Sequence, residues 1–173
     1  MPDLRPDPRL LLPARVDQYR GARWALALLV LYNVVATGRS LVHVLAPDSG
    51  AESIGTIDVD VEGGDNVVAL LGQWGGAQLL MAVLVWIVLA RYRGLVPLML
   101  AGAVLEALLR LLVGQLKPLE TVGTPPGGPG TYVALVVCGA ALVASLVPRD
   151  RATPPPLSGR RARPGSAGRT ARW

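Results

Sequence analysis

VVALLGQWGGAQLLMAVLVWIVLA at residues 67–90 and GLVPLMLAGAVLEALLRLLV at residues 94–113 decide the fold, because only Arg91, Tyr92 and Arg93 separate them. The two runs are 24 and 20 residues long and almost entirely apolar. At a rise of ~1.5 Å per residue, helices of these lengths span a hydrocarbon layer of ~30 Å. The stretch therefore predicts two antiparallel membrane-spanning helices joined by a tight basic turn.

Two further apolar runs flank this pair, at residues 24–46 and 131–147. Residues of the set AVILMFWYC make up 51% of the 173-residue chain, and mean hydropathy is +0.43. Charged residues fall mostly between the runs, which leaves no soluble core to build. The first run could be a cleaved secretory signal, but its length and its internal Asn33, Arg39 and His43 favour an uncleaved anchor. We therefore expect an all-α fold, a polytopic four-helix bundle in a membrane.

The distribution of arginine predicts the orientation. Basic residues concentrate in the leading segment 1–23, in the turn at 91–93 and in the tail at 148–173. The loop at 47–66 has six acidic residues and no basic one. Because basic segments remain on the cytoplasmic side, the chain is predicted to be a multi-pass protein of the cell (inner or cytoplasmic) membrane, with both termini in the cytoplasm.

Both tails are predicted to be disordered. Residues 148–173 mix Pro, Gly, Ser and Arg with few apolar side chains, and such a segment cannot bury enough surface to offset its ordering entropy. A basic tail beneath a membrane attracts anionic headgroups, so membrane lipids are the expected partners. Nucleic acid is not expected, because the chain has no folded basic domain. In the leading tail, residues 14–23 are predicted to extend the first helix along the interface.

The acidic loop is predicted to contain a short extracytoplasmic β-like strand. Residues 57–62, IDVDVE, alternate apolar and acidic side chains, and the two glycines that follow indicate a turn. Asp65 or Asn66 would then cap the second span. The run DVDVEGGD also resembles the start of an EF-hand calcium loop, but the position of its bidentate Glu is Ala69, inside a span. We favour a solvated acidic cap and expect no metal.

The informative chemistry lies inside the spans. Ionisable side chains near the bilayer centre cost at least ~2.5–3.5 kcal/mol each, so they tend to face the bundle interior and to mark function. Counting along the helices places the polar residues in the outer half of the bilayer, whereas the inner halves are almost purely aliphatic. The candidate ligand-binding residues are Arg39, His43, Gln73, Glu106 and Arg110.

Helical spacing adds a pairing to this set. Glu106 and Arg110 are four residues apart on one helix face, with the acid first, which predicts a salt bridge within the third span. One carboxylate cannot neutralise two arginines, so an anion between Arg39 and Arg110 would balance the charge. Instead of binding a ligand, the arginines could extend to the lipid headgroups, and Gln73 and Gln78 could form hydrogen bonds between helices.

Small residues predict close helix packing. Gly72 and Gly76 form a GxxxG pattern in the second span, which lets another helix approach closely. That helix could belong to the same chain, to a second copy in a homodimer or to another membrane protein. Cys138, the single cysteine, lies in the fourth run, so no disulfide can form within the chain.

Four short motifs carry a resemblance: GQWGGAQLL at 72–80, RYRG at 91–94, LLRLLVGQ at 108–115 and TPPGGPG at 124–130. Across residues 24–147 the chain resembles small bacterial four-span membrane proteins grouped under domains of unknown function. The resemblance implies an integral membrane protein and no established activity.

Three functions are compatible with these residues. The favoured one is a binding or accessory protein with a polar pocket in the outer half of the bilayer that holds a lipid or an amphiphilic anion. The alternatives are a small dimeric transporter that uses Glu106, and a membrane-embedded enzyme that uses Glu106 and His43 on a lipid-like substrate. An enzyme is the less favoured reading, and the sequence indicates no cofactor and no defined catalytic set.

Overall fold

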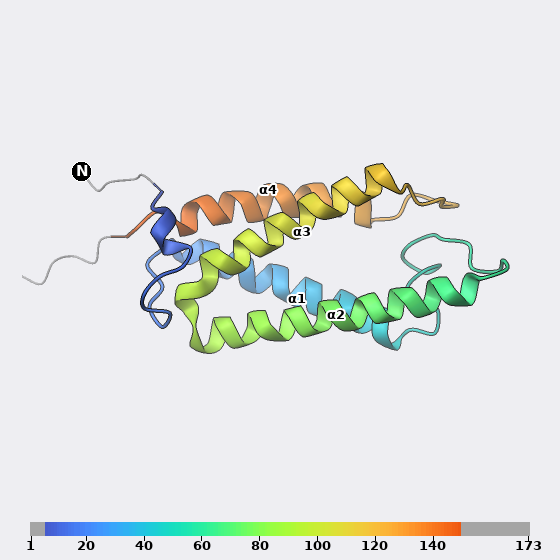
Figure 1. The fold of residues 1–173 in the computed structure, drawn as a ribbon, viewed down its shortest axis with the longest axis horizontal. Coiled ribbons are helices and arrows are strands. Elements are labelled where there is room, and N and C mark those ends of the chain that lie inside the picture. Colours follow the sequence, from blue (N-terminus) through green and yellow to red (C-terminus); the bar gives the residue numbers. More distant parts are fainter. Residues whose placement is uncertain (1–5, 150–173) are drawn as a thin grey trace, which may run out of the picture.

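The computed structural model describes residues 6–149, and four long α-helices account for most of them (Figure 1). They are α1 (Arg23–Leu45), α2 (Gly64–Arg91), α3 (Val96–Leu116) and α4 (Gly127–Ser145), and two short 3-10 turns, η1 (Pro8–Leu10) and η2 (Arg93–Leu95), lie outside them. All four α-helices are long and apolar enough to cross a membrane, which confirms the predicted all-helical fold with four candidate spans. The predicted disorder of the C-terminal tail falls almost entirely outside the described residues.

The helix ends follow local sequence signals. Gly63 precedes α2 with a φ of 84°, left-handed backbone that glycine adopts without strain. The predicted capping of α2 by Asp65 or Asn66 is wrong: no side chain caps this helix, and Asp65 lies in its first turn, where its charge still favours the helix N-terminus. Pro97 occupies the first turn of α3, where its missing N–H breaks no helical hydrogen bond.

Neighbouring helices follow the order α2, α1, α4, α3 around the bundle. α2 and α3 come together at the turn that joins them and diverge toward the opposite end (Figure 1). The main buried apolar cluster lies in the half of the bundle that contains this turn. Its members are Ala22, Ala25, Leu29, Leu89, Val96, Leu100 and Ala141. Because α2 and α3 diverge in the other half, only long side chains can connect the two helices there.

Residues 6–22 form a strap across the end of the bundle and bond to the α2–α3 turn and the end of α4 (Figure 1). The Val16 carbonyl accepts from the Gly94 amide at 2.8 Å, and the Ala22 amide donates to the Ala144 carbonyl at 3.3 Å. The predicted helical extension over residues 14–23 is therefore wrong before Arg23. Its backbone groups bond to other elements instead of to a helical turn of their own.

The predicted β-like strand at 57–62 is also wrong, since the described residues contain no strand. A strand needs a neighbouring segment that pairs with its backbone over several residues. Here Thr56 accepts one bond from the Val122 amide at 2.9 Å, and the Asp60 amide turns to the Asp58 side chain at 3.0 Å. The alternating apolar and acidic residues therefore lie in a loop that has no ladder of backbone hydrogen bonds to a neighbouring strand.

Asp48 organises the start of this loop. Its carboxylate accepts hydrogen bonds from the Gly50 amide at 3.0 Å and the Ser53 amide at 2.8 Å. These bonds lower the pKa of Asp48 to about 2, and the bond from Ser53 has the largest effect. Ser49 and Gly50 between them have positive φ angles of 49° and 71°, which reverse the chain direction directly after α1.

Candidate functional site: a polar cluster centred on Glu106

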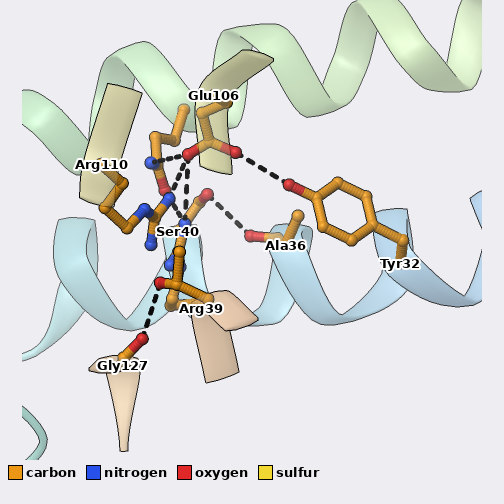
Figure 2. A network of polar contacts seen from close by, with 9 residues as sticks. Tyr32, Ala36, Arg39, Ser40, Glu106, Arg110 and Gly127 are labelled. Carbon is orange, nitrogen blue, oxygen red and sulfur yellow. Dashed lines mark hydrogen bonds and ion pairs between the residues drawn. The ribbon is translucent and has the colours of Figure 1, made fainter. Parts of the chain in front are cut away.

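Glu106 on α3 is the centre of a polar network that joins three helices (Figure 2). Its Oε2 accepts a hydrogen bond of 2.8 Å from the Tyr32 hydroxyl on α1. Its Oε1 accepts from Arg110, one turn further along α3, and from the Gln78 amide on α2 at 3.1 Å. Nη2 of Arg39 on α1 lies 4.0 Å from the same Oε1. We call these five residues the Glu106 cluster; they include the predicted salt bridge between Glu106 and Arg110.

Arg39 is held by two further contacts. Its Nη2 donates to Oε1 of Gln78 at 2.5 Å, so Gln78 accepts from Arg39 while it donates to Glu106. Its Cζ lies 5.2 Å from the centroid of the Trp74 ring, and Cζ of Arg110 lies 5.5 Å from the same ring. Both distances are within the ~6 Å range of cation–π attraction. Trp74 on α2 therefore contacts the two arginines of the cluster, which come from α1 and α3.

The cluster has one more positive than negative charge, because two guanidinium groups share one carboxylate. The side chains of Arg39, Glu106 and Arg110 are 30%, 40% and 27% exposed on the surface of the chain. The Arg39 Nε atom is buried and has no hydrogen-bond partner among the described residues. Chemically, the arrangement can attract an anion and offer it guanidinium N–H donors.

His43 is close to the cluster but is bonded elsewhere. Its Nδ1 lies 2.6 Å from the Ser49 carbonyl oxygen in the loop after α1, and the residue is 6% exposed. Its ring centroid is 5.1 Å from that of Trp74, at an interplanar angle of 54°. His43 thus packs on Trp74 and fixes the loop to the end of α1, and no hydrogen bond joins it to Glu106 within residues 6–149.

The structure does not bring Gln73 to this site. Gln73 is exposed, and no side-chain hydrogen bond to it is found in the described region, whereas Gln78 lies inside the cluster. Trp74 and Gln78 are four residues apart and share a helix face, while position 73 is rotated by about 100° from position 74. The sequence offered both glutamines, and only the rotation of α2 distinguishes them.

Close packing of α1 against α2 uses Gly75 together with Gly72. A Cβ atom at position 75 would overlap the Cβ of His43 and lie 3.2 Å from its carbonyl carbon, and a Cβ at position 72 would lie 3.2 Å from Oγ of Ser49. A Cβ at Gly76 would meet no described atom within 4 Å. The GxxxG pattern therefore does not mark the face that contacts α1, because the contact follows a spacing of three.

Two polar residues at this site, Tyr32 and Asn33, were not singled out from the sequence. Tyr32 precedes Arg39 by seven residues, two helical turns, so the spacing itself places both on one face of α1. Asn33, which follows Tyr32 and is 1% exposed, donates from its side-chain amide to the Ala82 carbonyl at 3.1 Å and fixes α1 against α2. A search for polar residues at helical spacing from Arg39 would have found Tyr32.

Comparison of the whole chain with family models, with curated proteins and with solved structures gave no match. The resemblance to small four-span membrane proteins therefore stays a prediction. Within the described residues, no group of three or more His, Cys, Asp and Glu side chains is placed to hold a metal ion.

Proposed function

We propose that this chain is an integral membrane protein of the binding or accessory type, and that the Glu106 cluster binds the headgroup of a lipid or another amphiphilic anion. In this proposal the basic segments place both termini in the cytoplasm of a bacterial cell, so the cluster faces the outer half of the cell membrane. The observation that carries the proposal is the sharing of one carboxylate, Glu106, by two partly exposed guanidinium groups.

An excess guanidinium charge inside a bilayer is costly unless an anion compensates it. Arg39 and Arg110 come from α1 and α3, and each is directed toward the same Glu106 oxygen. An anion bound beside Glu106 would complete the charge balance and would connect two helices that have few contacts of their own. Amphiphilic ligands fit better than small ions, because the surrounding helix surface is apolar and exposed.

The alternatives have less support in the geometry. A proton-carrying Glu106 would have to exchange partners during transport, yet it is bonded to Tyr32, Gln78 and Arg110 at once. An acid and base pair of Glu106 and His43 would need both side chains at one substrate, yet Nδ1 of His43 is engaged by Ser49. Proton flux in vesicles, or turnover of a lipid that Glu106→Gln abolishes, would favour these alternatives over binding.

The proposal is tested by changing the charge of the cluster in both directions. Phosphatidylglycerol is added to the purified protein in detergent, and native mass spectrometry gives the number and affinity of bound lipids. Arg39→Gln and Arg110→Gln each reduce the cluster to zero net charge and should remove one bound lipid. Glu106→Gln raises the net charge of the cluster by one and should tighten the binding of that lipid. The affinity should rise about tenfold if the lipid gains one charge-assisted hydrogen bond.

Arg91→Gln is the matched control, because it removes the same charge from an exposed position at the C-terminal end of α2. It should leave the number of bound lipids at the wild-type value. Equal lipid binding by the wild type, Arg39→Gln and Arg110→Gln would mean that the cluster only joins helices, and the proposal would be abandoned.

A further inference from the structure

A second group of basic residues lies at the end of the bundle that the N-terminal strap crosses. The structure contains a cavity of about 930 Å³ there. Its lining comes from the strap, the first turns of α1, the α2–α3 turn and the chain after α4. The charged residues that line it are Asp17, Arg20, Arg23, Arg93 and Arg149. This cavity is separate from the Glu106 cluster and shares no residue with it.

Backbone contacts hold the walls of the cavity together. The Arg149 amide donates to the Arg20 carbonyl at 2.9 Å, which joins the chain after α4 to the strap. Position 94 must be glycine for the α2–α3 turn to approach, since a Cβ there would lie 2.7 Å from the Arg15 carbonyl oxygen. Tyr19 donates from its hydroxyl to the Ala22 carbonyl at 2.8 Å, and burial raises its pKa to about 12, so it remains a neutral hydrogen-bond donor.

The charges around this cavity are unbalanced. Four arginines and one aspartate line it, and none of the four arginines forms an ion pair within the described part of the chain. Arg93 uses its Nε for a bond of 2.9 Å to the Leu89 carbonyl, which orients the guanidinium and leaves its terminal nitrogens available. Guanidinium groups pair with phosphate and carboxylate oxygens in bidentate geometry, so the arginines can bind an anion of this kind, a phosphate included.

Apolar surface adjoins the arginines. Leu26 lines the same cavity one turn beyond Arg23, at the point where the apolar surface of α1 starts. An anion with an acyl chain would place its phosphate among the arginines and its chain along α1. Basic pockets between spanning helices at the headgroup level are known to hold anionic lipid headgroups. A soluble phosphate would leave the Leu26 side of the cavity unfilled.

We propose that this cavity binds the phosphate of an anionic phospholipid from the leaflet on the side of the termini, and that the bound lipid stabilises the strap. The lipid connects the strap, the α2–α3 turn and the end of α4, three segments that otherwise share a few backbone hydrogen bonds. This site is independent of the one proposed at Glu106, since the two share no residue and the Glu106 cluster lies in the middle stretches of α1, α2 and α3.

The test uses the full-length wild-type protein in detergent and measures the rate at which phenylglyoxal modifies each arginine, mapped by peptide mass spectrometry. Phosphatidylglycerol at ten times its Kd should slow the modification of Arg20, Arg23 and Arg93 about tenfold, because only unoccupied sites react. Arg91 does not line the cavity, so its rate of modification should not change. Phosphatidylcholine and inorganic phosphate are the comparison ligands, and each should protect much less.

Equal protection of Arg91 and Arg93 would overturn the site, because it would indicate general attraction of lipid to basic surface. Protection by inorganic phosphate as strong as that by the lipid would overturn the lipid as the ligand. Arg93→Gln and Arg23→Gln should each abolish the protection at the remaining cavity arginines, whereas Arg91→Gln should preserve it. Using two separate cavity variants keeps the result decisive if one of them fails to fold.

Discussion

Glu106 shows how a single residue can decide the charge balance of a membrane bundle. It accepts hydrogen bonds from Tyr32, Gln78 and Arg110, and it is the one carboxylate within reach of Arg39 among the described residues. Removal of this carboxylate leaves two guanidinium groups facing each other with no negative partner. Loss of one arginine is less severe, because the other still contacts Glu106.

A double-mutant cycle tests this asymmetry. Glu106→Gln should lower the free energy of unfolding in detergent by about 1–3 kcal/mol, since it leaves uncompensated, half-buried positive charge. Addition of Arg110→Ala to this variant should restore part of the loss, because one of the two repelling groups is gone. Thermal unfolding followed by size exclusion compares the wild type, Glu106→Gln, Arg110→Ala and the double variant. If the loss in the double variant equals the sum of the two single losses, the two side chains do not interact.

Helix α2 shows how close approach is decided at the scale of an element. Gly72 and Gly75 admit the end of α1, while Gln78 belongs to the Glu106 cluster and Trp74 contacts its two arginines. One stretch of α2 therefore provides both the packing contact and the polar contact. The rotation of α2 about its axis determines which of its glycines pack against α1 and which of its glutamines reaches Glu106.

The two adjacent glycines of α2 offer a matched comparison. Gly75→Ala should destabilise the protein by about 1–3 kcal/mol, because the new methyl group overlaps His43 and forces α1 away. Gly76→Ala should be neutral or stabilising by up to about 1 kcal/mol, because its methyl group meets no described atom and alanine favours the helix. Melting temperatures of the two variants give the result. A larger loss for Gly76→Ala would show that position 76 is packed, as it would be against a second copy of the chain.

At the scale of the whole molecule, the two ends of the bundle differ in charge. The strap, the α2–α3 turn and the end of α4 bring arginines to one end, while the acidic loop lies at the other. The first and last described segments meet at the basic end, which an even number of spans requires. Basic segments remain in the cytoplasm during insertion, so this asymmetry predicts the orientation.

Reporter fusions test that orientation directly. A reporter that is active only outside the cytoplasm should be active when fused after Gly50 and inactive when fused after Arg93 or Arg149. The three fusion points sample the acidic loop, the α2–α3 turn and the chain beyond α4. Activity after Arg93 together with inactivity after Gly50 would invert the topology and place the Glu106 cluster in the inner half of the bilayer.

The amino-acid sequence by itself determined the number and approximate extent of the spans. Hydropathy is a local property, and a bilayer admits only segments that satisfy their own backbone hydrogen bonds, so runs such as 67–90 must be helices. The pairing of Glu106 with Arg110 was predictable for the same reason, since helical spacing alone places them on one face.

Tertiary structure alone decided the rest. The use of Gln78 in place of Gln73, and of Gly75 in place of Gly76, depends on how α2 is rotated against α1, which no local pattern records. The strap across residues 6–22 depends on backbone hydrogen bonds to segments such as Gly94 and Ala144, far away in the sequence. Long-range contacts of this kind fix which polar groups meet, because each is made only when distant elements are already in place.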